Sequence, residues 1–267
     1  LERVSEEIVG IVRPHELCEL GSGVGRKVRL ILDAMKRRGL LERCVLLDIS
    51  EGFLVESAHQ LDADYPDLEV RGVVGDFLAD LPALGPGGGR LALFLAGTMG
   101  NLHPDRVPGF LRALARQLAP GDSFLLGLDL VKDEARLNAA YNDAAGVTAE
   151  FNRNILRVVN THLGANFEPE AFEHVAFYDR EKAWIEMRLR ATRDMPVSIP
   201  GATLDVAFRR GDELRTELSC KYTRPSLEAL VAGTGLWVEG WYTDPDELFV
   251  SALLRRTEGE VPPGGEP

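Results

Sequence analysis

The sequence predicts an α/β fold in which a mostly parallel sheet is interrupted by an inserted α+β domain. Over residues 1–130, short apolar runs alternate with amphipathic helical patterns, as in a sheet covered by helices. A long helical pattern and then alternating segments replace this order over residues 131–221, before two more apolar runs. We therefore expect one domain from residues 1–130 and 222–256, an inserted domain over residues 131–221 and a disordered tail over residues 257–267.

Composition and charge limit the classes of function. The chain has 267 residues, of which 45% are apolar, so it can form a sizeable core. The formal net charge of −12 argues against binding to nucleic acid or an anionic membrane, which requires clustered Lys and Arg. No apolar run reaches the roughly 20 residues of a membrane span, and no charged and apolar leader precedes the first helix. We expect a cytoplasmic protein without a nucleic-acid or membrane partner, and we favour a monomer.

The cysteines and the one basic run have ordinary structural explanations. Cys18, Cys44 and Cys220 form no C-x-x-C pair, so the sequence indicates neither a disulfide framework nor a metal site. The basic run at residues 36–38 fits a helix C-terminus, where the helix dipole favours cations. Neither feature points to a functional site.

The first elements follow from the spacing of apolar residues. Residues 1–12 place apolar side chains on one helical face, and Pro14 ends this helix before a short buried strand at residues 17–20. A second helix follows over residues 28–35, where apolar residues recur at i, i+3, i+4 and i+7. A glycine-rich turn joins this strand to this helix, which is the beginning of a nucleotide-binding α/β sheet.

The spacing of glycines in this turn distinguishes between two kinds of cofactor. At Gly21, Gly23 and Gly25 the backbone can turn tightly and approach a ligand, because no Cβ stands in the way. The dinucleotide pattern G-x-G-x-x-G is not met in either register, so a dehydrogenase is disfavoured. The pattern E-x-G-x-G-x-G, which begins at Glu19, instead resembles the first motif of class I S-adenosylmethionine-dependent methyltransferases. Such enzymes have a Rossmann-like sheet of seven strands.

Acidic and aromatic residues end the next two strands. The strand at residues 44–47 stops at Asp48, which is placed to accept hydrogen bonds from both hydroxyls of a ribose. Capping of the next helix is the alternative role for this carboxylate. The third strand, residues 70–75, ends in Asp76 and Phe77. These two side chains suit an adenine, because one can accept from its amine and the other can pack on its ring.

The fourth strand delivers small and polar residues to the same edge of the sheet. It covers residues 91–95 and leads to Gly97, Thr98 and Asn101. A methyltransferase places its acceptor substrate at this edge, so we expect these groups to face the transferred methyl. A helix and the fifth strand, residues 123–130, complete this part of the sheet.

The inserted domain combines helices with an antiparallel sheet. Four alternating segments predict its strands, at residues 173–178, 184–191, 204–208 and 215–222. In the last segment, period two places Arg215, Glu217, Ser219 and Lys221 on one face. This polar face can be a binding surface or simply solvated. The chain then returns to the first sheet with a helix and two strands, at residues 226–231, 237–242 and 248–254, the last strand being antiparallel.

Several longer stretches together resemble one family. They include Val74-Gly75-Asp76-Phe77, Gly100-Asn101-Leu102, Asp129-Leu130-Val131-Lys132-Asp133, Ala144-Ala145-Gly146-Val147-Thr148-Ala149, Phe151-Asn152-Arg153-Asn154 and Ile185-Glu186-Met187. On these stretches the chain is similar to the histidine-specific, S-adenosylmethionine-dependent methyltransferases of ergothioneine biosynthesis. The resemblance implies trimethylation of the α-amine of L-histidine to hercynine. It covers almost the whole chain and makes the inserted domain the substrate-binding one.

The resemblance also implies roles for individual residues. It assigns the cofactor S-adenosylmethionine to Gly21, Gly23, Lys27, Asp48, Asp76 and Phe77. It assigns the amino-acid end of histidine to Gly97, Thr98, Asn101 and Tyr141, and the imidazole to Glu217 and Ser219, with Met187 beside the ring. A carboxylate can accept from one imidazole N–H while a hydroxyl serves the other nitrogen. Because methyl transfer is an in-line displacement, we expect no catalytic nucleophile and no metal, only alignment of the amine.

Two departures from the family keep other functions open. The residues at 24–26 are Val, Gly and Arg where members carry a Thr-Ser-Glu type sequence, and the chain starts at the helix just before the first strand. Family members place aromatic residues from an N-terminal helical region over the bound histidine, so we expect the chain as given to bind histidine poorly. The alternatives are a methyltransferase for another small amine or amino acid, a cofactor-binding protein without activity and, most distantly, a dehydrogenase.

Overall fold

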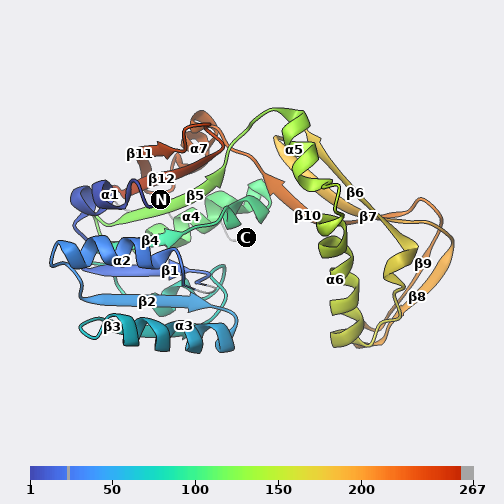
Figure 1. Cartoon of the computed structure of the whole chain (residues 1–267), viewed down its shortest axis with the longest axis horizontal. Helices are drawn as coiled ribbons and strands as arrows, with labels where there is room; N and C mark the ends of the chain where they lie inside the picture. Colours follow the sequence, from blue (N-terminus) through green and yellow to red (C-terminus); the bar gives the residue numbers. More distant parts are fainter. Residues whose placement is uncertain (23–24, 260–267) are drawn as a thin grey trace. The chain divides into compact units, whose positions relative to one another are not determined.

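The computed structural model describes residues 1–22 and 25–259 and divides them into two compact units (Figure 1). The first unit contains Leu1–Leu130 and the residues that follow Lys221, and the second contains Val131–Lys221. The predicted tail at residues 257–267 falls mostly outside the described residues, and so does the predicted cofactor residue Gly23.

The first unit is built on a seven-stranded sheet. The strands lie in the order β11-β12-β5-β4-β1-β2-β3 (Figure 1), and their bounds are β1 Glu16–Leu20, β2 Arg43–Asp48, β3 Glu69–Val74, β4 Arg90–Phe94, β5 Ser123–Asp129, β11 Leu236–Thr243 and β12 Phe249–Arg256. β12 is antiparallel to both of its neighbours, β5 and β11, whereas the pairs formed by β1 to β5 are parallel. The predicted α/β sheet of seven strands with an antiparallel last strand is therefore confirmed.

Helices cover this sheet and seal its core. They are α1 Ser5–Val12, α2 Val28–Arg37, α3 Glu51–Asp64, α4 Val107–Ala115 and α7 Arg224–Val231, with short 3-10 turns at η1 Leu81–Leu84, η2 Thr98–Asn101 and η3 Pro104–Arg106. The apolar sides of α1, α2 and α3 share one buried cluster with β1, β2 and β4. All residues of β1 and β4 are buried, as expected for central strands of a parallel sheet that is covered on both faces.

A buried charge pair holds β1 and β4 together at their amino-terminal ends. The guanidinium of Arg90 is 1% exposed and donates to the carboxylate of Glu16. Its remaining N–H groups donate to the carbonyl oxygens of residues 84–86 and 117. A buried charge needs such a complete set of partners. This end of the sheet is structural, which leaves the carboxyl ends of the strands for a ligand.

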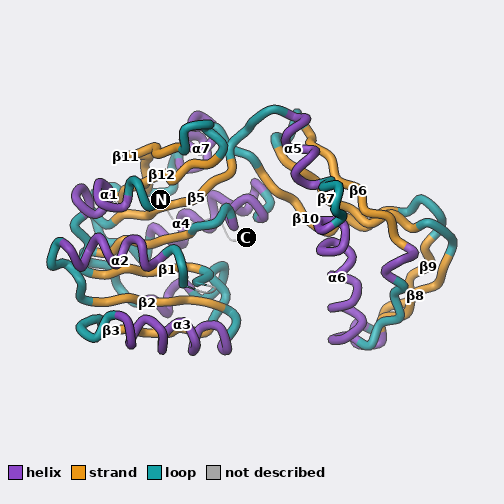
Figure 2. The backbone as a smooth tube through the Cα atoms, in the orientation of Figure 1, coloured by secondary structure: helices purple, strands orange, loops and turns teal. Residues whose placement is uncertain are grey.

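The second unit packs two helices on one antiparallel sheet. Its helices are α5 Glu134–Tyr141 and α6 Val147–Leu163, and its main sheet has the order β10-β7-β6, with β6 Phe172–Asp179, β7 Trp184–Ala191 and β10 Glu213–Cys220 (Figure 2). Short 3-10 turns lie at η4 Pro169–Ala171 and η5 Pro200–Ala202. The long helical pattern of the sequence is thus two helices, separated by a turn that ends at Gly146 with a φ of 72°.

Two predictions about these strands were wrong. A separate two-stranded sheet forms from β8 Met195–Ile199 and β9 Leu204–Phe208, whereas the sequence analysis placed the second of them in a single sheet and missed the first. Pro196 breaks the strand pattern of β8, and it is tolerated because β8 pairs on one side only. In β10, a bulge lies between Arg215 and Glu217, which ends the simple alternation of faces.

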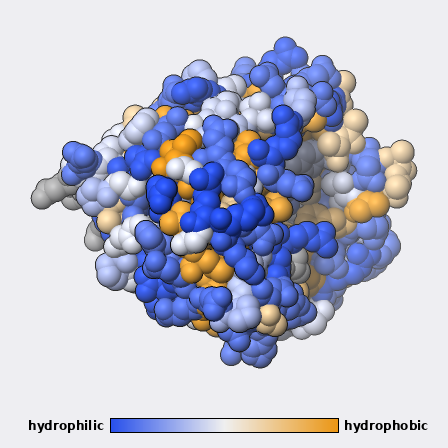
Figure 3. Space-filling view, turned by 60° about the vertical axis from the view of Figure 1, so that its left-hand side comes forward, coloured by the Kyte–Doolittle hydropathy of each residue, from blue (hydrophilic) through white to orange (hydrophobic). Residues whose placement is uncertain are grey.

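The surface is largely polar. Figure 3 shows one face of the molecule, on which hydrophilic residues predominate and hydrophobic residues form separate patches. No helix among the described residues is long and apolar enough to cross a membrane. Within the same residues, no group of three or more His, Cys, Asp or Glu side chains is arranged to hold a metal ion.

Candidate active site

In the first unit, the predicted cofactor residues lie at the carboxyl ends of neighbouring strands. Gly21 follows β1 with a φ of +69°, and its N–H donates to the carbonyl oxygen of Leu47 at 2.8 Å. A side chain is strained in this conformation, so glycine fits the turn best. Strands β2 and β4 lie on opposite sides of β1 in the sheet. Open α/β sheets bind ligands at such a switch in strand order.

The carboxyl group of Glu19, at this edge, is buried and has a strongly raised pKa. The side chain is 4% exposed, and its Oε2 has no hydrogen-bond partner among the residues that the structure describes. Burial raises the pKa of Glu19 to about 8, an effect that Lys27 opposes and Asp48 reinforces. The hydroxyl of Ser22 is also buried, and residues 1–22 and 25–259 offer it no partner. Buried polar atoms are normally satisfied, so these two atoms mark a place for a polar ligand beside the glycine turn.

Asp48 and Asp76 use part of their carboxylates to shape the backbone. One oxygen of Asp48 accepts from the N–H of Ser50 at 2.9 Å, and one oxygen of Asp76 accepts from the N–H of Leu78 at 2.8 Å. Both side chains are partly exposed. The local hydrogen bonds fix the direction of each carboxylate and leave the residue able to accept from a ligand.

Phe77 and the residues after β4 complete this edge. The ring of Phe77 packs on Phe94, with 4.8 Å between ring centroids, and remains partly exposed. Gly97 has a φ of +76°, and the hydroxyl of Thr98 donates to the carbonyl oxygen of Leu95 at 3.1 Å. The side chain of Asn101 is exposed at the end of η2. The structure thus places the predicted residues of this unit along one sheet edge, except Gly23, which is not described.

In the second unit, the structure brings the four predicted substrate residues together. Glu217 stands opposite Met187, and Ser219 stands opposite Ile185, in the antiparallel pairing of β10 with β7. Opposed residues share one face of a sheet. Tyr141 reaches this face from α5, and its hydroxyl donates to Ser219 Oγ at 2.8 Å. Tyr141, Met187, Glu217 and Ser219 therefore belong to one surface.

Arg215 does not share that surface, contrary to the expectation from period two. It stands opposite Arg188, whereas Glu217 stands opposite Met187, the adjacent residue on β7. Adjacent residues on a strand point to opposite faces, so the bulge turns Arg215 away from Glu217. The face toward α5 consequently carries Glu217, Ser219 and Lys221, and the positive charge of Arg215 lies on the opposite face.

Lys221 is the residue on this face to which the sequence analysis gave no role. It is 3% exposed, and its Nζ donates to Ser219 Oγ at 2.7 Å and to the hydroxyl of Tyr141 at 3.0 Å. Burial raises the pKa of Glu217, and the nearby Lys221 partly opposes this shift. The signal in the sequence was its period-two spacing from Glu217 and Ser219.

The backbone of Tyr141 is held by a second set of hydrogen bonds. His174 Nε2 donates to the carbonyl oxygen of Tyr141 at 2.8 Å. Its other nitrogen, Nδ1, therefore accepts from the side-chain amide of Asn152 at 2.9 Å. Asn152 is 2% exposed. The end of α5 is fixed against β6 and α6, which reduces the freedom of the Tyr141 side chain.

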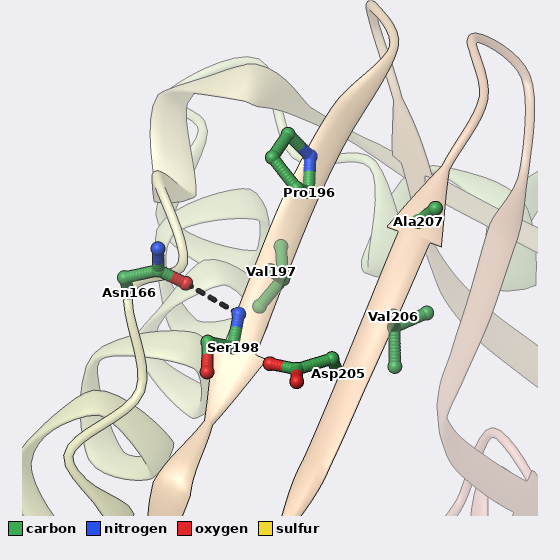
Figure 4. A pocket seen from close by; sticks show the side chains of 7 residues that line it. All are labelled: Asn166, Pro196, Val197, Ser198, Asp205, Val206 and Ala207. Atoms are coloured by element: carbon green, nitrogen blue, oxygen red, sulfur yellow. Dashed lines mark hydrogen bonds between the residues drawn. The ribbon is translucent and has the colours of Figure 1, made fainter.

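A second surface feature lies on the β8–β9 hairpin (Figure 4). This open pocket is lined by Asn166, Pro196, Val197, Ser198, Asp205, Val206 and Ala207. The side chain of Asn166 already accepts from the N–H of Ser198 at 2.7 Å, as Figure 4 shows. None of the predicted site residues lines this pocket. The side-chain amide of Asn166 is already hydrogen-bonded to the backbone of Ser198.

A family model matches almost the whole chain. The model described as histidine-specific methyltransferase, SAM-dependent, matches residues 1–256. The chain belongs to this family. S-Adenosylmethionine is accordingly the cofactor of this histidine-specific methyltransferase.

Individual relatives extend the comparison. A protein named histidine N-alpha-methyltransferase from Mycolicibacterium smegmatis is 46% identical over 252 residues, which cover 94% of this chain and 78% of the relative. A protein of the same name from Mycobacterium tuberculosis is 44% identical with the same coverage. A solved S-adenosylmethionine-dependent methyltransferase from Clostridium acetobutylicum matches with a TM-score of 0.54 over 96% of this chain and 90% of that one, at 10% identity. This last likeness concerns the fold alone, and it agrees with the predicted class I arrangement.

The residues of the methyltransferase's first unit fit the cofactor. S-Adenosylmethionine carries an ammonium, a carboxylate, a ribose and an adenine. The unpartnered oxygen of the buried Glu19 suits a cationic group, and Lys27 at the start of α2 suits an anionic one. The sequence analysis recognised Glu19 only as part of the motif. Its burial, and an oxygen without a partner among the described residues, make Glu19 suitable for the cofactor's cationic group.

Proposed function

We propose that the protein transfers three methyl groups from S-adenosylmethionine to the α-amine of L-histidine, giving hercynine in ergothioneine biosynthesis. The observation that carries this proposal is the pairing of a half-buried carboxylate, Glu217, with a hydroxyl, Ser219, on one face of β10. An imidazole offers one N–H and one bare nitrogen, and this pair can serve both. The thioether of Met187 and the ring of Tyr141 provide apolar contact beside them.

We assign the cofactor to the sheet edge of the first unit. Asp48 accepts from the ribose hydroxyls, Asp76 and Phe77 hold the adenine, and Glu19 and Lys27 hold the amino-acid end together with the turn at Gly21. When bound, the cofactor supplies an electrophilic methyl on a sulfonium. The chain contributes by holding its ligands in place and by excluding water.

We assign alignment of the amine to Gly97, Thr98, Asn101 and Tyr141. A neutral amine is required for attack, and a site that excludes water disfavours the ammonium form. No side chain needs to form a covalent bond. The site must still accept the amine after each methylation, so hydrogen-bond acceptors rather than a tight cation pocket suit this position.

Mass spectrometry tests the proposal directly. The protein is incubated with S-adenosylmethionine and histidine, and mono-, di- and trimethylated products are measured; we expect trimethylhistidine to accumulate. A parallel incubation with tryptophan, phenylalanine and small amines tests the alternative that another amine is the substrate. Methylation of one of these in preference to histidine would replace the substrate assignment. Cofactor binding without any methylated product would favour a binding protein.

A further inference from the structure

The side chains of Lys221, Ser219 and Tyr141 form a closed triangle of hydrogen bonds. Lys221 Nζ lies 2.7 Å from Ser219 Oγ and 3.0 Å from the hydroxyl of Tyr141, and these two oxygens lie 2.8 Å apart. The lysine is also stacked over the Tyr141 ring, with Nζ 4.9 Å from its centroid. Lys221 and Ser219 are both buried. The geometry of all three groups is therefore mutually fixed.

Counting hydrogens shows what this triangle can offer a ligand. A lysine ammonium can only donate, so it fills two of the three edges with its own hydrogens. The third edge joins two hydroxyls 2.8 Å apart, and we assign its hydrogen to Tyr141, because a phenol is a better donor than an aliphatic hydroxyl. Ser219 Oγ then accepts two hydrogen bonds, which use both of its lone pairs. Its own hydroxyl hydrogen must donate outside the triangle.

We infer that Lys221 is a positioning residue that makes Ser219 an obligate hydrogen-bond donor. On this face of β10, Ser219 then donates to the one imidazole nitrogen that can accept a hydrogen bond. Without the lysine, a serine hydroxyl either donates or accepts. With the lysine, Ser219 serves only the bare nitrogen, and Glu217, two residues away on the same face, serves the N–H. The ring is then recognised as a neutral imidazole in one orientation.

This inference rests on the proposed function and adds to it a rule for ring specificity. A ring that keeps an N–H but has no bare nitrogen leaves the Ser219 hydrogen unpaired, which a buried donor tolerates poorly. The two isomers of β-pyrrolylalanine are such rings. A thiazolylalanine is the reverse case, because it keeps a bare nitrogen and has no N–H for Glu217.

The test measures competition between histidine and each analogue as a ratio of kcat/KM, in the wild type and in Lys221→Met. We expect the wild type to prefer histidine over both pyrrolylalanines, and we expect Lys221→Met to lower this preference by about tenfold, the value of one hydrogen bond. The preference over thiazolylalanine should fall less. Lys221→Arg keeps the donors and should restore part of the preference.

Three controls separate this role from a purely structural one. Lys182→Met removes an exposed lysine that pairs with Asp179 on the β6–β7 turn, and it should leave all ratios unchanged. A structural role for Lys221 would lower the thermal midpoint and kcat for every substrate alike, with no change in the ratios. In a Ser219→Ala background, Lys221→Met should change the pyrrolylalanine ratio no further.

Each outcome decides the inference. If the wild type methylates histidine and Lys221→Met keeps its preference over the pyrrolylalanines, the inference is wrong while the proposed function stands. If the wild type methylates another amino acid or amine in preference to histidine, both are wrong. If Lys221→Met does not fold, Tyr141→Phe replaces it, because loss of the other donor also frees a lone pair of Ser219; an unchanged preference in that variant overturns the inference.

Discussion

At the scale of single residues, the carboxylates of the predicted sites differ in their burial. Asp48 and Asp76 are partly exposed and fixed by backbone N–H groups, so they remain ready to accept from a ligand. Glu19 and Glu217 are more buried, and burial raises the pKa of both. A carboxylate held in this way gains most when a cationic or N–H group of a ligand arrives.

The ribose assignment of Asp48 predicts a loss of cofactor affinity. Losing an acid that accepts from the ligand typically costs about 1.5 to 3 kcal/mol, so Asp48→Ala should weaken S-adenosylmethionine binding by about one to two decades. Calorimetry measures the affinity. Asp67→Ala, at an exposed position after α3, is the matched control. Equal affinities for the wild type and Asp48→Ala would refute the assignment.

The raised pKa of Glu19 predicts a dependence of stability on pH. The folded protein holds this proton up to a pH of about 8, whereas the unfolded chain releases it near 4.5. The folded state therefore binds more protons between these values, and its stability falls as pH rises through this window. Thermal unfolding without ligand should show the wild type losing stability relative to Glu19→Gln from pH 5 to pH 8. Parallel curves for the two proteins would argue against a buried, uncompensated Glu19.

The imidazole assignment of Glu217 predicts a loss of selectivity. A site built to hydrogen-bond a ring N–H rejects rings that lack it, because its own carboxylate is left unpaired. Glu217→Ala should therefore narrow the preference for histidine over phenylalanine in a competition assay. Glu213→Ala is the control, since Glu213 lies on the same strand as Glu217 and pairs with Arg188 and Arg190 of β7. A wild-type preference in Glu217→Ala would show that another group reads the ring.

At the scale of elements, the two ends of β1 have different tasks. Its amino-terminal end carries Glu16, which is paired with the buried Arg90, and its carboxyl end carries Glu19 and the glycine turn. One strand thus anchors the sheet at one end and leads, at the other, to the turn that we propose binds the cofactor. The separation allows stability and cofactor binding to be changed independently.

Glu16→Gln tests this separation. Removing one partner of a buried pair leaves the other charge uncompensated, so we expect a loss of about 3 to 5 kcal/mol in the free energy of unfolding. Urea denaturation measures the loss. Glu42→Gln breaks an exposed pair with His15 and should cost at most about 1 kcal/mol. Cofactor affinity below the unfolding transition should be unchanged; a parallel loss of affinity would show that the two ends of β1 are coupled.

At the scale of the whole molecule, the two ligands should protect different units from hydrogen exchange. S-Adenosylhomocysteine, which cannot transfer a methyl, should protect residues 17–22, 46–50 and 74–80, whereas histidine should protect residues 138–142 and 214–221. The hairpin of β8 and β9 should be unaffected and serves as an internal control. Protection of that hairpin by histidine would move the substrate to the pocket of Figure 4.

The sequence by itself determined the fold class and the family, and it predicted the sheet edge at which we propose that the cofactor binds. Apolar periodicity, glycine spacing and the acid at each strand end are local features, and they are visible in a few consecutive residues. The same local features predicted α6 from Val147, Phe151, Ile155 and Val158. Tertiary structure decided that these four are exposed and that Asn152 lies on the buried side of the helix.

Only the tertiary structure decided how the face of β10 is composed. The bulge after Arg215 depends on pairing with β7, and the triangle of Lys221, Ser219 and Tyr141 joins residues about 80 positions apart in the chain. Period two counts positions along one strand and contains no information on a bulge or on a partner from a helix. Pro196 likewise interrupts the sequence pattern of β8, and the strand forms because it pairs with β9. Long-range pairing therefore sets which polar groups meet, whereas local pattern sets only which elements carry them.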